Sequence, residues 1–260
     1  MHLEVSLLEE LKGKTALVTG ASRGIGAATA ITLARAGVSR VVIHYGGYRE
    51  GAEETLALVE GAGAEADLAS GDLGTPQGIH DFIADLKVTA PEIDILINNA
   101  GSLVQRAKLA EFTPELFDRV MNLNVKSVYF ISQAVAPYMI SKESGVIVNV
   151  SSIAARNGGG PGATIYAAAK AAVSTITKGM AKELAPRGIR VNAVSPGTVD
   201  NHFHEVFSNR QILDSVVAQT PAGTLGTNEE VADTILFLCS NASRYIYGQT
   251  IEINGGMFMV

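Results

Sequence analysis

The sequence predicts an α/β fold in which helices cover both faces of a parallel sheet. Short apolar runs rich in branched residues recur along the 260 residues, and helical stretches separate them. Several runs are apolar on both faces, which is typical of parallel strands buried between helices. No linker, repeat or low-complexity segment interrupts this alternation. We therefore expect one doubly wound domain over residues 1–260.

Seven strands are expected, six from clear apolar runs and one from a weaker run. The clear runs are residues 14–19, 40–45, 93–98, 145–150, 188–195 and 248–253, and the weaker one is 65–71. Helices are expected at 24–36, 50–61, 76–88, 114–140, 164–185 and 229–240. Residues 198–226 interrupt the alternation near the end of a strand, where folds of this kind place a substrate lid.

Composition excludes some classes of function. The formal net charge of −6 argues against nucleic acid as the main partner. The single cysteine, Cys239, cannot form an internal disulfide and fits a reducing compartment, so we expect a cytoplasmic protein. The N-terminal segment has no apolar run of signal length, and no segment approaches the ~18 apolar residues of a membrane span. We expect no membrane partner.

A glycine turn follows the first strand, with the spacing Gly20-x-x-x-Gly24-x-Gly26. Gly20 permits a tight turn, Gly24 lets the backbone approach a pyrophosphate, and Gly26 allows the helix and strand to pack closely. The helix that follows offers free N–H groups and a partial positive charge to phosphates. The turn therefore predicts a dinucleotide site, although three glycines alone can also be simple punctuation of the chain.

The end of the second strand predicts NADP(H), with NAD(H) the less favoured cofactor. NAD binding usually places an acid there to hold the ribose 2′-hydroxyl, whereas this chain has His44, Tyr45 and Gly46. Arg23 in the turn and Arg49 after the strand could bind a 2′-phosphate, for which a guanidinium is well suited. Tyr45 is a further candidate for cofactor contact. The alternative is that Arg23 is a solvated turn residue.

Tyr166 and Lys170 stand four residues apart in a predicted helix and therefore share one helix face. A free phenol titrates near ~10 and is a poor acid or base at neutral pH. A nearby ammonium group lowers a phenol pKa by about 1–3 units. The pair therefore predicts a phenol that exchanges a proton with a carbonyl or alcohol oxygen. The alternative is a surface contact without chemistry.

Four motifs occur in order: TGASRGIG at 19–26, LINNAG at 96–101, Tyr166-x-x-x-Lys170, and SPGTV at 195–199. With them the chain resembles the classical short-chain dehydrogenases/reductases over about residues 12–256. The segments YAAAKAAV, GIRVNAVSPG and YIYGQTIEINGG are similar to the 3-oxoacyl-carrier-protein reductase type. The resemblance implies a Rossmann-like fold and hydride transfer between a nicotinamide and a ketone or secondary alcohol. It also implies a homotetramer and a reaction that needs no metal.

The resemblance assigns site residues by position. The catalytic set is Asn124, Ser152, Tyr166 and Lys170, with Asn122 and Ser151 as alternatives in register. Phosphate contacts are implied for Gly20, Ser22, Arg23, Gly24, Ile25 and Gly26. Adenine contacts are implied for Asp72 and Leu73, adenine-ribose contacts for Asn99, Ala100 and Gly101, and nicotinamide contacts for Pro196, Gly197, Thr198 and Val199.

The family pattern also gives each catalytic residue a role. Ser152 would donate a hydrogen bond to the substrate carbonyl and orient it beside Tyr166. Lys170 would also bind the nicotinamide ribose. Asn124 would hold a helix backbone kinked around a water that links Lys170 to solvent.

The sequence of the lid, residues 198–226, does not identify a single substrate. An apolar wall is suggested by Phe203, Phe207, Ile212 and Leu213, while polar contacts could come from His202, His204 and Asn209. Asn201 stands where the family commonly has threonine. A 3-oxoacyl thioester, a sugar or polyol, and a small cyclic ketone are the candidate substrates. His202-x-His204 could ligate a metal, although a pair of lid residues is the simpler interpretation. A redox sensor that binds NADP(H) without turnover is the alternative from another class.

Overall fold

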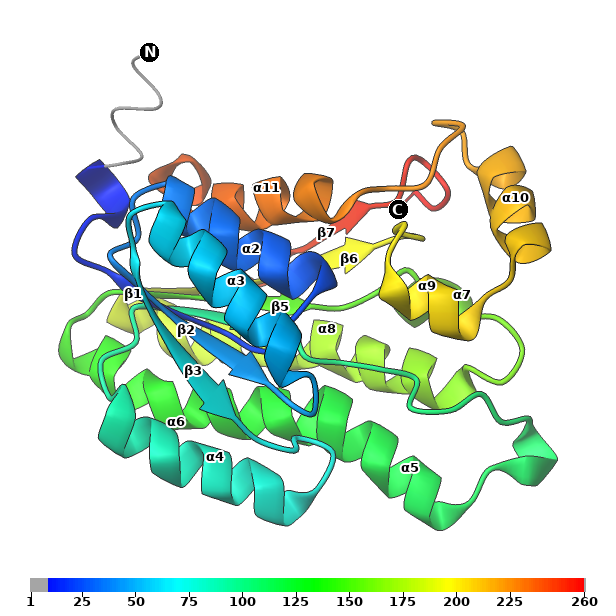
Figure 1. The fold of residues 1–260 in the computed structure, drawn as a ribbon, viewed down its shortest axis with the longest axis horizontal. Helices are drawn as coiled ribbons and strands as arrows, with labels where there is room; N and C mark the ends of the chain where they lie inside the picture. The colour runs from blue at the N-terminus through cyan, green and yellow to red at the C-terminus, as the bar shows by residue number, and fades with distance from the viewer. Residues whose placement is uncertain (1–8, 260) are drawn as a thin grey trace.

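A computed structural model describes residues 9–259, in which seven strands form one parallel sheet (Figure 1). The strands are β1 (Thr15–Val18), β2 (Arg40–Tyr45), β3 (Glu65–Ser70), β4 (Ile95–Asn98), β5 (Gly145–Val150), β6 (Ile189–Pro196) and β7 (Thr250–Ile253). Their order is β3-β2-β1-β4-β5-β6-β7. The predicted fold class is confirmed. The order reverses between β1 and β4, and ligands bind at such a reversal in open α/β sheets.

Helices cover both faces of the sheet (Figure 1). One face carries α2 (Gly24–Arg35), α3 (Arg49–Gly61) and α11 (Asn228–Cys239), and the other carries α4 (Pro76–Thr89), α6 (Ser127–Ser141) and α8 (Thr164–Leu184). The buried apolar side chains form two clusters, one containing Leu33 and Ile235 and the other containing Phe82 and Met139. Strands β4 and β5 are buried along their whole length. Their apolar character on both faces follows from this burial.

The helix expected at 114–140 contains an irregular turn. It divides into α5 (Pro114–Met121), a π-helical turn at Asn122–Lys126, and α6. The fully buried Asn124 lies in this turn, and its Nδ2 donates to the carbonyls of Val120 and Ser102, both at 2.9 Å. The Val120 carbonyl is the acceptor that the Asn124 backbone N–H would use in a regular α-helix. Single π-helical turns of this kind are frequent at functional sites.

The segment 198–226 folds into two helices that the sequence analysis did not assign. These are α9 (His202–Phe207) and α10 (Arg210–Gln219), which lie at the end of the sheet next to the short α7 (Ala154–Asn157) (Figure 1). Asn201 caps α9 by accepting from Phe203 N at 3.1 Å, and Asn209 caps α10 by accepting from Ile212 N at 2.9 Å. An isolated bridge joins Val199 to Gly226 and closes the base of the segment.

The sequence predicts that the N-terminal segment has no apolar run of signal length. Residues 1–8 of this segment lie outside the described part. No helix in the described part is both long enough and apolar enough to cross a membrane.

Candidate active site

A cleft of about 1020 Å³ opens at the carboxyl edge of the sheet, between the glycine turn and the lid. Most of the predicted site residues line it: Gly20, Ser22, Arg23, Gly24, Ile25, Asp72, Leu73, Asn99, Ala100, Gly101, Ser152, Tyr166, Lys170, Pro196, Gly197, Thr198 and Val199. Gly26, Tyr45 and Asn124 are the predicted residues that do not line it. The structure therefore brings together, at one surface, residues from six segments of the chain.

The glycine turn fits a dinucleotide pyrophosphate. Gly20 and Gly24 have positive φ values of 65° and 60°, which L side chains rarely adopt. A Cβ on Gly24 would meet no protein atom closer than 3.7 Å, and the residue lines the cleft, so the backbone is open to a ligand there. A Cβ on Gly26 would lie 2.3 Å from the Gly20 carbonyl oxygen and 2.5 Å from Asn99 Nδ2. Gly26 therefore shapes the turn without touching the cleft.

His44 holds the glycine turn from below, a role the sequence analysis missed. Its Nδ1 accepts from Gly20 N at 3.0 Å, and its Nε2 donates to the Gly71 carbonyl at 3.1 Å. The ring packs edge-on against Phe82 and is buried. Burial lowers the pKa of His44 to about 4, so the ring is neutral at physiological pH. The sequence signal for this role is a polar histidine near the end of an otherwise apolar strand, β2, which pairs with both β1 and β3.

Arg23 lines the cleft in the glycine turn and stacks on Tyr48. Its guanidinium carbon is 3.9 Å from the centroid of the Tyr48 ring, and both residues line the cleft. Arg49 is instead paired with Glu53, with a 2.8 Å Nε–Oε1 distance on the surface of α3. Of the two arginines proposed from sequence, Arg23 is therefore the one that lines the cleft. Tyr45, the further candidate for cofactor contact, packs against the core and does not line the cleft.

Asp72 is held by a residue that sequence reasoning missed. Both carboxylate oxygens of Asp72 accept from the Arg119 guanidinium, at 3.2 and 3.3 Å, and one also accepts from Gly74 N at 2.9 Å. Arg119 comes from α5 and lines the cleft as well. The bidentate pair fixes the carboxylate that the family pattern places beside the adenine.

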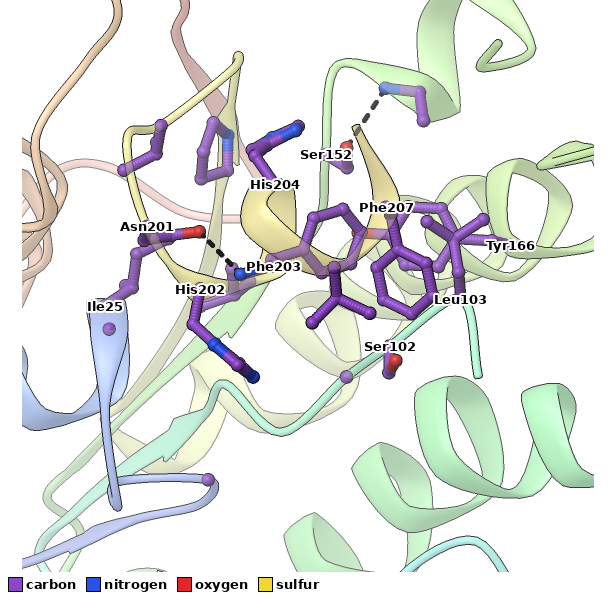
Figure 2. Close-up of a pocket in the computed structure, with 18 of the residues that line it drawn as sticks. Ile25, Ser102, Leu103, Ser152, Tyr166, Asn201, His202, Phe203, His204 and Phe207 are labelled. Carbon is purple, nitrogen blue, oxygen red and sulfur yellow. Dashed lines mark hydrogen bonds between the residues drawn. The ribbon is translucent and has the colours of Figure 1, made fainter. Parts of the chain in front are cut away.

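Ser151 and Ser152 have different hydrogen-bond partners, which bears on the choice between the two serines. The buried Ser151 hydroxyl donates to the Lys170 carbonyl at 2.9 Å and lies 2.9 Å from the Ser174 hydroxyl. Ser152 Oγ accepts from Ala154 N at 3.1 Å and points into the cleft near Tyr166 (Figure 2). The geometry therefore favours Ser152, the residue chosen from sequence, as the hydroxyl that reaches a ligand.

Lys170 does not contact the phenol of Tyr166. Its Nζ lies 5.8 Å from the Tyr166 ring centroid and donates to the Val150 carbonyl at 2.8 Å. Burial lowers the pKa of Lys170 to about 8. Burial also raises the pKa of Tyr166 to about 12, and hydrogen bonding to Ser152 opposes part of that rise. The expectation that the lysine by itself makes this phenol acidic is therefore wrong for the protein alone.

Asn124 reaches the site through Gly101 and Ser102. Its Oδ1 accepts from Ser102 N at 3.2 Å, so the side chain both accepts from and donates to that residue. A Cβ on Gly101 would lie 2.7 Å from Asn124 Oδ1 and 2.8 Å from Lys170 Nζ. The asparagine therefore packs close to the lysine under Gly101. The register alternative, Asn122, donates to the Gly74 carbonyl at 3.4 Å and does not line the cleft.

The lid carries an aromatic face over Tyr166. The ring of Phe203 is 5.8 Å from that of Tyr166 and 5.0 Å from that of Phe207, centroid to centroid (Figure 2). His202 pairs with Glu205, and the burial of His204 lowers its pKa. Among residues 9–259, no group of three or more ligating side chains is placed to hold a metal ion.

Comparisons with known proteins agree with this geometry. The family model described as enoyl-(acyl carrier protein) reductase, which represents short-chain dehydrogenases/reductases, matches residues 20–258. A 3-oxoacyl-(acyl-carrier-protein) reductase FabG from Staphylococcus epidermidis is 37% identical over 250 residues, covering 95% of this chain and 99% of the relative.

Solved structures with the same architecture act on different compounds. A gluconate 5-dehydrogenase from Burkholderia cenocepacia, in complex with NADP and tartrate, superposes with a TM-score of 0.87 at 33% identity, covering 97% of this chain and 98% of that one. A 7α-hydroxysteroid dehydrogenase, in complex with NADH and 7-oxo glycochenodeoxycholic acid, has a TM-score of 0.87 at 32% identity, covering 97% and 96%. With this fold, these motifs and these relatives, the chain belongs to the short-chain dehydrogenase/reductase family of oxidoreductases.

Proposed function

We propose that the protein is an NADP(H)-dependent oxidoreductase that reduces a ketone to a secondary alcohol, or runs the reverse reaction. One observation carries this proposal: Ser152, Tyr166 and Lys170 face the same cleft as the glycine turn and the Arg23–Tyr48 pair. A proton donor and a dinucleotide cradle in one cleft are the two requirements of carbonyl reduction by a nicotinamide.

The bound nicotinamide would supply the hydride, and the residues of the chain would manage the proton. Tyr166 would donate its phenolic proton to the oxygen of the reduced carbonyl, and Ser152 would hold that oxygen by a hydrogen bond. Lys170, anchored on the Val150 carbonyl, would stabilise the phenolate that remains. Asn124, packed under Gly101, would fix the position of Lys170.

NADP(H) is the cofactor that the residues favour. A 2′-phosphate needs a cation, and Arg23 lines the cleft beside the glycine turn with its guanidinium stacked on Tyr48, which supports this choice. The second strand ends in His44 and Tyr45, without the carboxylate that holds a ribose 2′-hydroxyl in NAD-dependent relatives. Some solved relatives contain NADP and another contains NADH, so the family alone does not decide this point.

A panel of carbonyl and alcohol compounds with both cofactors tests the proposal. The panel contains an acetoacetyl thioester, aldoses, diketones and cyclic ketones, and nicotinamide absorbance reports turnover. We expect oxidation of NADPH by at least one ketone, at a kcat/KM at least tenfold above that with NADH. A clear preference for NADH would refute the cofactor assignment, and no turnover with any compound would favour a non-catalytic redox sensor.

The homotetramer that the family resemblance implies is part of the proposal. Large apolar side chains remain exposed on α5 and α6, including Phe117, Tyr129 and Phe130, and burial of such side chains between copies would be favourable. Light scattering at micromolar concentration should give four times the monomer mass. A monomer mass would refute the assembly without affecting the catalytic assignment.

A further inference from the structure

The part of the cleft beyond Tyr166 is lined mainly by apolar side chains. Phe203 and Phe207 form an aromatic face over Tyr166 (Figure 2). The remaining apolar lining comes from the lid, the loop after β4 and the C-terminal segment: Leu103, Val206, Ile212, Leu213, Val216 and Met257. A carbonyl held at Tyr166 would therefore place the rest of its molecule against an apolar wall.

Three polar side chains of the lid make hydrogen bonds within the lid through one of their polar atoms. His202 Nδ1 lies 3.0 Å from a carboxylate oxygen of Glu205, and His204 Nδ1 lies 3.1 Å from the Ser208 hydroxyl. Asn201 Oδ1 caps the start of α9 (Figure 2). The two histidines were expected to contact polar groups of a substrate. Since Nδ1 of each ring is engaged within the lid, Nε2 is the ring nitrogen left for such a contact.

The other polar side chains on this side of the cleft also have backbone partners. Arg106 Nε donates to the Phe207 carbonyl at 2.8 Å, and its Nη1 donates to the Pro161 carbonyl at 2.9 Å. Asn157 Oδ1 accepts from Gly159 N at 2.9 Å. Arg106 therefore ties the C-terminal end of α9, which carries Phe203 and Phe207, to the glycine-rich loop before α8.

From this distribution we infer that the substrate is a ketone, or its secondary alcohol, with an alkyl or carbocyclic body and not a polyhydroxylated carbon chain. The inference rests on the proposed function and narrows it. A hydroxyl buried without a partner costs about tenfold or more in affinity. A methylene that leaves water for an apolar wall gains about fourfold.

A matched pair of ring ketones gives the sharpest test. Cyclohexanone and 2-keto-myo-inositol share the six-membered ring and the carbonyl group. They differ in five hydroxyl groups, about one on each other ring carbon of 2-keto-myo-inositol. With wild-type protein and NADPH, kcat/KM for cyclohexanone should exceed that for 2-keto-myo-inositol by at least about a hundredfold. It should rise further, by about fourfold per buried methylene, along 4-methyl-, 4-ethyl- and 4-propylcyclohexanone. Equal or faster turnover of the hydroxylated ketone, or no rise along the alkyl series, would overturn the inference.

Lid variants connect the selectivity to the wall. Ile212→Asn and Phe207→Asn should each reduce the rise of kcat/KM along the 4-alkylcyclohexanones. Because the side chain of Ile212 is 48% exposed, the Ile212→Asn protein should fold normally. Val88→Ala on α4, where the side chain is 82% exposed and does not line the cleft, is the matched control and should leave the series unchanged. If kcat/KM rose along the alkyl series as strongly in both lid variants as in the wild type, the apolar wall would not contact the substrate.

A binding measurement separates failure of the inference from failure of the proposed function. Calorimetry with Tyr166→Phe protein saturated with NADP⁺ needs no turnover, and 4-propylcyclohexanol should bind at least tenfold more tightly than myo-inositol. Tighter binding of myo-inositol would overturn the inference. If wild-type protein reduces neither type of ketone yet binds the apolar alcohol selectively, the proposed function fails and the apolar site stands.

Discussion

The ammonium nitrogen of Lys170 lies 5.8 Å from the ring centroid of Tyr166 and donates its hydrogen bond to the Val150 carbonyl, not to the phenol. At this separation, burial decides the ionisation of both groups, because it lowers the pKa of Lys170 to about 8 and raises the pKa of Tyr166 to about 12. A phenol with that pKa is a weak proton donor at neutral pH. An additional positive charge beside it would lower that pKa and make the phenol a better proton donor.

The first prediction concerns the pKa of Tyr166 when NADP⁺ is bound. The oxidised nicotinamide carries a positive charge, and a cation at close range lowers a phenol pKa by about 1–3 units. In the free protein, the absorbance difference between wild type and Tyr166→Phe should show no titration near the ordinary tyrosine pKa. With NADP⁺ the titration midpoint should move to lower pH. A midpoint that NADP⁺ does not change would contradict the proposed stabilisation of the phenolate.

The second prediction separates two arginines that sequence alone could not rank. Arg23→Ala should raise the KM for NADPH by about 10- to 100-fold, because charge-assisted hydrogen bonds of this kind contribute about 1.5–3 kcal/mol. The KM for NADH should change little. Arg49→Ala is the control, since Arg49 is 70% exposed in its side chain and paired with Glu53. Steady-state kinetics with both cofactors would refute the assignment if Arg49→Ala gave the larger NADPH-specific effect.

The third prediction concerns close packing at the glycine turn. Gly26→Ala should abolish NADPH binding and destabilise the fold, because the new Cβ would lie 2.3 Å from the Gly20 carbonyl oxygen. Gly61→Ala in α3 is the matched control: a Cβ there meets nothing within 4 Å, and a helical alanine should stabilise by about 0.5–1 kcal/mol. Thermal unfolding and NADPH fluorescence measure both effects. Normal cofactor binding by Gly26→Ala would contradict the role of this close contact.

The fourth prediction follows from the neutral His44 under the turn. Because the folded pKa of about 4 lies below the unfolded value of 6.5, the unfolded chain binds more protons between these values. The free energy of unfolding should therefore fall as pH decreases from about 6.5 to 4, by about 3 kcal/mol in total from this group. His44→Gln should remove that part of the pH dependence. Equal slopes for the two proteins in urea titrations at several pH values would refute it.

The sequence predicted the sheet and the main helices because their periodicity is strong. Strands β2 and β5 have the expected bounds, and no end of the other strands differs from its expected position by more than two residues. The short lid helices were missed because six and ten residues give little periodic signal, although Asn201 and Asn209 are ordinary caps. The π-helical turn at Asn124 depends on hydrogen bonds to Ser102 and Val120, and no local pattern encodes the first of these.

The candidate site was predictable where the family motif fixes a position and unpredictable where tertiary contacts decide. Ser152, Tyr166 and Lys170 reach one cleft as expected. The hydrogen bonds of His44 and the stacking of Arg23 on Tyr48 connect residues 24 or more positions apart, so spacing could not reveal them. The pKa of Tyr166 was misjudged because burial, which depends on the whole fold, outweighs the neighbouring charge.

The measurement that tests the central claim most directly is the comparison of wild type with Tyr166→Phe, which removes one hydroxyl from the cleft. The change should lower kcat by at least about a thousandfold, within the range that positioned proton donors contribute, and should leave the dissociation constant for NADPH within about twofold. If Tyr166→Phe reduced the same ketone at a rate close to that of the wild type, the phenol would not be the proton donor, and the mechanism proposed for this site would be contradicted.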